Sequence, residues 1–153
     1  MGVFFAFEQT GLGQIQFAAL IKRKRAGHIP VPRGDARAAV KTMSIAAQIV
    51  RERGISLLIF PEGGRSRDGS LGTFKEGAAY IAIQAGVPLV PVGVKGTRDV
   101  LPFGSGHVKK GNVTMRIGDP IPTDQASPRD RVRLTAALRH QILALQEEQP
   151  IHA

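Results

Sequence analysis

The sequence contains no cysteine, few aromatic residues (5%) and no run of about 18 consecutive apolar residues. The absence of cysteine excludes disulfide scaffolds, zinc sites built on thiolates and thiol nucleophiles, and it agrees with a reducing compartment such as the cytoplasm. Without a long apolar run, we expect no membrane-spanning helix. Residues 1–6 carry neither the basic start of a signal peptide nor the serine or threonine of a myristoylation site.

What the sequence does contain fits one compact domain. Its 153 residues are 42% hydrophobic and 22% charged, and a chain of this size buries a core without a metal or a disulfide. The 21 lysines and arginines exceed the 12 acidic residues, which gives a net charge of +9. This excess points to anionic partners, which are phosphate groups, nucleic acid or a negatively charged membrane. We expect residues 1–153 to form a single domain.

Four segments have the spacing and end signals of helices. The clearest is amphipathic, with Asp35 as N-cap and Gly54 as its end. Near the C-terminus, Ser127 followed by Pro128 and Asp130 opens a helix whose apolar stripe contains Leu134, Leu138, Ile142 and Leu145. The predicted helices are residues 15–25, 36–53, 76–85 and the segment beginning at 128.

Apolar runs between these helices predict strands. Residues 3–7, 56–60 and 87–94 have the continuous apolar pattern of buried strands, and residues 112–117 alternate like a strand with one exposed face. Residues 29–33 contain two prolines and predict an edge strand or an extended segment, and residues 95–111 predict a long loop. The order of elements indicates a mixed α/β fold with a largely parallel central sheet flanked by helices on both faces.

The loop after the second apolar run is the first candidate site. Residues 60–70 place two glycines, two arginines and Glu62 just beyond a predicted strand, where ligands bind in open α/β sheets. Glycines let the backbone approach an oxyanion, and the arginine fork matches phosphate oxygens. The residues alone leave a solvated turn at Asp68 and Gly69 as an equal alternative.

The second candidate site is residues 27–35. Here Arg33 lies beside the N-terminus of the amphipathic helix, and helix N-termini attract anions. A surface arginine next to an ordinary capped helix explains the same residues.

Together the two segments resemble the lysophosphatidic acid acyltransferase family, the glycerol-phosphate acyltransferases of phospholipid synthesis. Residues 60–66 (Phe-Pro-Glu-Gly-Gly-Arg-Ser) are similar to the family's Phe-Pro-Glu-Gly-Thr-Arg-Ser signature, and residues 74–77 to its continuation into a helix. Residues 87–92 resemble the next block, a strand interrupted by prolines, and residues 27–33 resemble the block whose arginine holds the acceptor phosphate. The match runs from about residue 3 to residue 122.

The resemblance implies roles for individual residues in substrate binding. It implies that Arg33 and Arg65 clamp the acceptor phosphate and that Gly63 and Gly64 allow its close approach. We expect Glu62 to orient an arginine or to bond backbone amides of the loop, because a carboxylate repels phosphate. The candidate substrate-binding set is Arg33, Glu62, Gly63, Gly64, Arg65, Ser66 and Lys75, with no metal site.

The sequence departs from the family pattern in two places. Gly64 stands where threonine is usual, and the catalytic motif, a histidine with an aspartate five positions later, is absent. His28, His107 and His140 are followed at that distance by arginine, asparagine and leucine, and His152 is too near the end. We therefore assign no catalytic residue and expect an N-terminally incomplete acyltransferase domain with negligible turnover.

The resemblance implies acyl transfer from acyl-CoA or acyl carrier protein to the sn-2 hydroxyl of 1-acyl-glycerol 3-phosphate, giving phosphatidic acid. It requires no cofactor beyond the acyl donor as co-substrate. We expect the protein to be cytoplasmic and peripheral on the inner face of an anionic membrane. The alternative is a non-catalytic phosphate- or lipid-binding domain. Nucleic acid is the least favoured partner, because the few aromatic residues offer little for base stacking.

Overall fold

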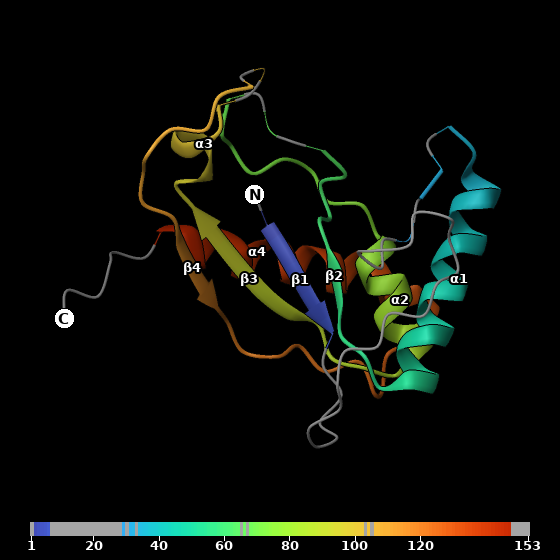
Figure 1. The fold of residues 1–153 in the computed structure, drawn as a ribbon. Coiled ribbons are helices and arrows are strands. Elements are labelled where there is room, and N and C mark those ends of the chain that lie inside the picture. Colours follow the sequence, from blue (N-terminus) through green and yellow to red (C-terminus); the bar gives the residue numbers. More distant parts are fainter. Residues whose placement is uncertain are drawn as a thin grey trace.

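The computed structural model describes residues 2–6, 29, 31–32, 34–64, 66, 68–102, 104 and 106–147, with residues 2–6 as backbone. A four-stranded sheet in the order β2-β1-β3-β4 forms the centre, and helices pack beside it and across it (Figure 1). The strands are β1 (Gly2–Ala6), β2 (Leu57–Ile59), β3 (Val90–Lys95) and β4 (Thr114–Ile117). The helices are α1 (Ala36–Arg53), α2 (Gly77–Ala85), α3 (Thr97–Val100) and α4 (Arg131–Glu147), with a 3₁₀ turn η1 (Pro128–Asp130) before α4.

All the strand pairs of this sheet are antiparallel. The backbone of Phe4 in β1 lies opposite Ile59 of β2 on one side and Pro91 of β3 on the other, and β3 pairs with β4. The prediction of a mixed α/β fold is confirmed, but a largely parallel sheet is wrong for neighbouring strands. The crossover through α2 does make β2 and β3 run in the same direction, as predicted, but β1 is inserted between them and pairs with both in the opposite direction.

The strand β2 is at the edge of the sheet, which corrects the prediction that it is buried on both faces. Leu58 is 46% exposed and Phe60, just after the strand, is 43% exposed. A continuous apolar run is compatible with a central or an edge strand, since the pairing partners are not encoded locally. By contrast, Val90–Gly93 in β3 are all buried, as the sequence predicts.

The helix α1 has the ends that its sequence predicts. The Asp35 carboxylate accepts a hydrogen bond from the Ala38 N–H at 3.0 Å, and Gly54 ends the helix in the left-handed conformation (φ 57°) with its N–H bonded to the Val50 carbonyl. The buried face of α1, Ala46, Ala47 and Val50, joins the core formed with α2 and α4.

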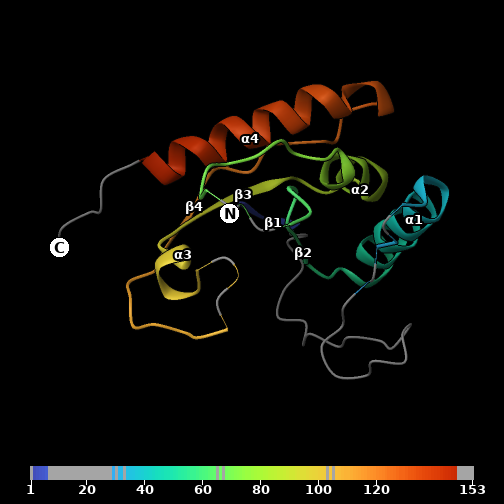
Figure 2. The ribbon, with the colours of Figure 1, turned by 90° about the horizontal axis from the view of Figure 1, so that it is seen from above.

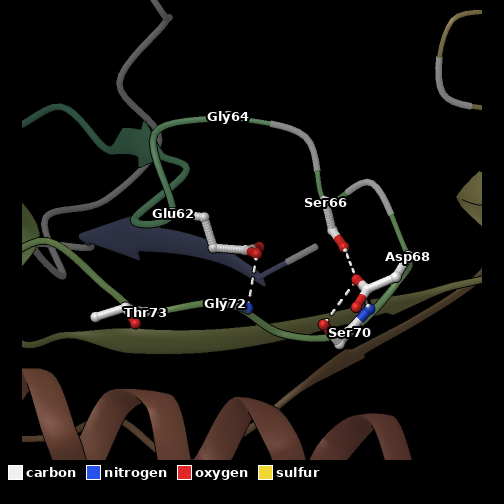
Figure 3. A pocket seen from close by; sticks show the side chains of 7 residues that line it. All are labelled: Glu62, Gly64, Ser66, Asp68, Ser70, Gly72 and Thr73. Atoms are coloured by element: carbon white, nitrogen blue, oxygen red, sulfur yellow. Dashed lines mark hydrogen bonds between the residues drawn. The ribbon is translucent and has the colours of Figure 1, made fainter.

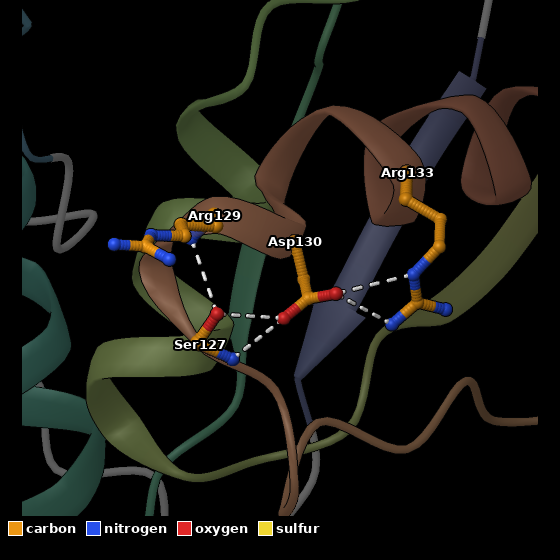
Figure 4. Close-up of polar contacts among 4 residues, drawn as sticks. All are labelled: Ser127, Arg129, Asp130 and Arg133. Atoms are coloured by element: carbon orange, nitrogen blue, oxygen red, sulfur yellow. Dashed lines mark hydrogen bonds and ion pairs between the residues drawn. The ribbon is translucent and has the colours of Figure 1, made fainter.

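The helix α4 begins with a capping box (Figure 4). Ser127 Oγ accepts from the Arg129 N–H at 3.3 Å, and the Asp130 carboxylate accepts from the Ser127 N–H at 2.9 Å. The first turn is 3₁₀ and the α-helix starts at Arg131. The Ser127 N–H and hydroxyl, and then the Arg133 guanidinium, lower the pKa of Asp130 to about 2.

The core fixes α4 along one face of the sheet, with α3 on the opposite side (Figure 2). The apolar stripe of α4 is at most 1% exposed at Leu134, Leu138 and Ile142.

The short helix α3 lies within the segment predicted as a loop. The predicted helix over residues 15–25 lies outside the described residues, and the described residues of the 29–33 segment, 29, 31 and 32, form no strand.

Candidate functional site

The candidate site is the loop that joins β2 to α2, residues 60–75, which we call the signature loop. It is closed at its base, because the Lys75 N–H donates to the Pro61 carbonyl at 2.9 Å. A tight turn follows, in which the Gly63 N–H donates to the Phe60 carbonyl at 3.0 Å. Pro61 and Phe74 are buried at the two ends of the loop, which therefore stands on the core.

Glu62 ties the outgoing half of the signature loop to the returning half. Its Oε2 accepts a hydrogen bond from the Gly72 N–H at 3.0 Å, across ten positions of sequence (Figure 3). This is one of the two arrangements expected from the sequence, a carboxylate bonded to a backbone amide of the loop. The bond keeps the two halves of the loop at a fixed separation.

The tip of the signature loop is held by Asp68. Its Oδ1 accepts from the Ser66 hydroxyl at 2.8 Å, from the Ser70 N–H at 3.0 Å and from the Ser70 hydroxyl at 2.7 Å. These hydrogen bonds, those from Ser70 first, hold the pKa of Asp68 well below its usual range, so the carboxylate is ionised at neutral pH. The Ser66 hydroxyl also accepts from the Gly69 N–H at 2.8 Å, so its hydrogen bonds in this structure lie within the loop.

The loop surrounds an open hollow of about 270 Å³ (Figure 3). Its lining residues are Glu62, Gly64, Ser66, Asp68, Ser70, Gly72 and Thr73. Two of these described residues, Glu62 and Asp68, carry carboxylates, so the part of the hollow that they line is negatively charged.

Among the described residues, three cationic side chains lie against the backbone of the signature loop. The Lys75 ammonium is beside Gly63, where a Cβ atom would be 3.1 Å from its Nζ, and Gly63 has the left-handed φ of 72° that favours glycine. At the tip, a Cβ atom on Gly69 would lie 2.7 Å from Nη1 of Arg98. On the returning half, the guanidinium of Arg139 donates to two backbone carbonyls. Lys75 was expected from the sequence, whereas Arg98 and Arg139 were not.

Arg98 and Arg139 carry no local sequence signal. Arg98 lies in α3, and Arg139 lies in α4, 67 positions after Gly72. Only the tertiary fold brings them to the loop, and neither belongs to a recognisable motif. An excess of positive charge over the whole chain was the one sequence feature that pointed towards them.

The structure places the other predicted residues as follows. Arg33 and Arg65 lie outside the described residues. Apart from its chain neighbours, no described residue has an atom within 4 Å of a Cβ placed on Gly64, so these residues leave room for the threonine usual in the family. Of the histidines, His107 and His140 are described, and both are exposed.

Two features are absent from the described part of the chain. Among these residues, no group of three or more histidine, cysteine, aspartate or glutamate side chains could hold a metal ion. None of the helices in the same residues has the length and apolar character needed to cross a bilayer.

Comparison with known proteins gives the family. The sequence model of the family described as Acyltransferase matches residues 3–95, which run from β1 through the signature loop to the end of β3. The chain belongs to the acyltransferase family. This match covers the segments on which the resemblance was based and ends before α4.

Individual members of the family are similar to this chain over part of their length. The 1-acyl-sn-glycerol-3-phosphate acyltransferase of Limnanthes douglasii is 38% identical over 99 residues, which are 65% of this chain and 35% of that protein. The human 1-acyl-sn-glycerol-3-phosphate acyltransferase alpha is 32% identical over 123 residues, which are 80% of this chain and 44% of that protein. The chain thus spans less than half the length of these relatives.

The fold agrees with a solved member of the acyltransferase family. The crystal structure of the 1-acyl-sn-glycerophosphate acyltransferase PlsC from Thermotoga maritima superposes with a TM-score of 0.60 and 28% sequence identity. The superposition covers 74% of this chain and 47% of that one.

Proposed function

We propose that the protein transfers a fatty acyl group from acyl-CoA or acyl carrier protein to the sn-2 hydroxyl of 1-acyl-glycerol 3-phosphate, forming phosphatidic acid. The names of the relatives in Limnanthes and in humans support this acceptor, and one similar relative, 43% identical, is a chloroplastic enzyme of Brassica napus. We propose that the signature loop binds the acceptor phosphate.

One observation carries this proposal. The family signature begins at the end of β2 and folds into a closed loop, in which the Lys75 ammonium lies beside the left-handed Gly63. A glycine backbone without side chains and an adjacent cation suit a phosphate group, because the anion then approaches N–H groups and a positive charge together. In this proposal Arg65 adds its guanidinium to the same group and Arg33 reaches it from the segment before α1.

The proposed reaction needs a proton acceptor. The sn-2 hydroxyl oxygen attacks the thioester carbonyl carbon, the carbon–sulfur bond breaks, and the hydroxyl proton passes through a base to the departing thiolate. A positioned general base accelerates such a step by about 10²- to 10⁴-fold. The family motif, a histidine with an aspartate five positions later, does not occur in these 153 residues. We therefore assign the chain's residues to acceptor binding and expect negligible turnover from the chain alone.

The acceptor proposal is tested by calorimetric titration of the 153-residue chain. The ligands are a short-chain 1-acyl-glycerol 3-phosphate, used below its critical micelle concentration, and the matching 1-acyl-glycerol without phosphate. We expect binding of the first, little binding of the second, and a loss of affinity in Arg65→Ala. Arg51→Ala, which removes an exposed arginine near the end of α1, is the control and retains affinity. Equal affinity for the two ligands would contradict phosphate recognition.

Catalysis is tested separately with labelled acyl-CoA and the same acceptor. We expect no acyl transfer by the 153-residue chain above the uncatalysed rate. Rapid transfer would show that a base other than the family's histidine serves the reaction.

The missing motif also favours a second candidate, a non-catalytic lipid-phosphate binder. The gene sequence before the Met1 codon separates the two, because the enzyme requires an in-frame histidine and aspartate with the family spacing.

We also propose that the protein acts peripherally on the inner face of an anionic membrane, where its acceptor resides. The net charge of +9 supports this, and so do the exposed apolar side chains of the edge strand β4, with Met115 60% and Ile117 63% exposed. Sedimentation with vesicles tests it. We expect binding to phosphatidylglycerol vesicles that weakens with salt, and little binding to phosphatidylcholine vesicles. Equal binding to both would contradict the proposal.

A further inference from the structure

Arg139 connects α4 to the signature loop by two hydrogen bonds. Its Nε donates to the Gly72 carbonyl at 3.0 Å and its Nη2 donates to the Leu71 carbonyl at 2.8 Å. The two donors belong to one edge of a planar guanidinium, and the two acceptors are consecutive carbonyls. This geometry needs the arginine fork, because a lysine ammonium is a single point of charge.

The base of the Arg139 side chain is fixed in space. Its neighbour Leu138 is fully buried, and Ile142, one turn later, is fully buried as well. The helix thus packs firmly on the sheet and on α2, and it runs beneath the returning half of the loop (Figure 3). A half-buried arginine on such a helix is a rigid support for the backbone that it bonds.

The Gly72 residue is thereby held from two sides. Its carbonyl accepts from Arg139, and its N–H donates to Glu62, which is part of the family signature. Leu71, whose carbonyl bonds Arg139, packs its side chain on the core. The position of Glu62, and with it the turn at Gly63, therefore depends on a helix that lies after the segment matched by the family model, residues 3–95.

We infer that Arg139 is a positioning residue for acceptor binding: it holds the returning half of the signature loop so that the outgoing half keeps its phosphate-binding shape. This inference rests on the proposed function, because it assigns the phosphate to that loop. In this inference Arg139 acts through the loop backbone, to which two of its donors are bonded. Its removal loosens Gly72 first, then Glu62, and then the backbone that binds phosphate.

The test compares Arg139→Ala, Arg139→Lys and the control Arg133→Ala in the 153-residue chain. Arg133 lies on the same helix, has a 69% exposed side chain and pairs with Asp130, so its loss removes the same charge without touching the loop. Calorimetry with the short-chain 1-acyl-glycerol 3-phosphate gives the affinity. We expect Arg139→Ala to weaken binding about ten- to a hundredfold, Arg139→Lys to restore part of the loss, and Arg133→Ala to bind as wild type.

Hydrogen exchange of the Gly72 amide gives a second readout that needs no ligand. We expect faster exchange in Arg139→Ala and wild-type exchange in Arg133→Ala, with the amides of α2 unchanged in both. Wild-type affinity or wild-type Gly72 exchange in Arg139→Ala would overturn the inference, and so would equal losses of affinity in Arg139→Ala and Arg133→Ala. If the wild-type chain does not bind the acceptor, the proposed function is overturned. The Gly72 exchange data need no ligand and still report whether Arg139 holds the loop, so the two failures are distinguishable.

Discussion

At the scale of single residues, Gly96 is the glycine with the closest contact to its Cβ position among those whose surroundings the structure describes. It lies between β3 and α3 with a left-handed φ of 89°, and a Cβ atom there would overlap the carbonyl oxygen of Asn112. Both the backbone conformation and the contact require glycine. Gly104 has a similar φ of 77°, and apart from its chain neighbours no described residue has an atom within 4 Å of its Cβ position, which makes the two glycines a matched pair.

We predict that Gly96→Ala lowers the free energy of unfolding by about 2–5 kcal/mol, because it adds a steric overlap to the cost of a left-handed alanine. Gly104→Ala is expected to cost about 1–2 kcal/mol, the conformational part alone. Urea denaturation of both variants measures the difference. Equal losses would show that the backbone next to Asn112 moves away without resistance.

Asp130 makes the stability depend on pH. Its pKa is about 2 in the folded chain against 3.8 for an ordinary aspartate, because the Ser127 N–H and hydroxyl and the Arg133 guanidinium favour the carboxylate. The unfolded chain then takes up the proton first on acidification, so this stabilisation is present above about pH 4 and is lost as the pH falls towards 2. We predict that the difference in unfolding free energy between wild type and Asp130→Asn shrinks over this interval. Urea denaturation at several pH values measures it, and a difference that stays constant would contradict the capping-box account.

The residues that the sequence predicts correctly at this scale are those whose partners are close along the chain. Asp35 caps a helix through Ala38, three positions later, and Ser127 reaches Arg129 and Asp130. Arg139 was not predicted, because its partners are 67 and 68 positions away and any exposed arginine on a helix looks the same in sequence. Local patterns encode caps, and they do not encode contacts between distant loops and helices.

At the scale of elements, α4 is the support on which the sheet and the signature loop depend. Leu138 is fully buried at its centre, whereas Val132 is 66% exposed near its start. We predict that Leu138→Ala lowers the free energy of unfolding by about 2–5 kcal/mol, since it leaves a cavity between α4 and the core. Val132→Ala is expected to change it by no more than about 0.5 kcal/mol. Thermal and urea unfolding of the two variants measure this, and similar values would mean that α4 contributes little to the core.

The helices were predicted better than the sheet for a physical reason. Helical periodicity and caps are properties of consecutive residues, so α1, α2 and α4 could be located from sequence. Strand pairing is a property of the whole chain. The insertion of β1 between β2 and β3 cannot be read from residues 56–60, whose apolar run fits an edge strand and a central strand equally well. The four-residue helix α3 is too short to show a period.

At the scale of the whole molecule, the fold brings distant elements to one loop. The signature loop leaves the edge strand β2, returns into α2, is bonded from below by α4 and is contacted at its tip by α3. The family motif could be found from sequence alone, because it is continuous. Its support could not, because Arg98 and Arg139 come from elements that follow it in the chain. The residues of the signature loop are therefore consecutive in sequence, whereas the residues that hold the loop in place come from distant elements.

The central claim, that the signature loop binds the acceptor phosphate, is tested most directly by a nuclear magnetic resonance titration of the 153-residue chain. A short-chain 1-acyl-glycerol 3-phosphate is added below its critical micelle concentration, and the amide resonances are followed. We predict that the largest shifts occur at Gly63, Gly64 and Lys75, with small shifts along α1. Shifts concentrated on β4 or α1, with the signature loop unchanged, would contradict the claim.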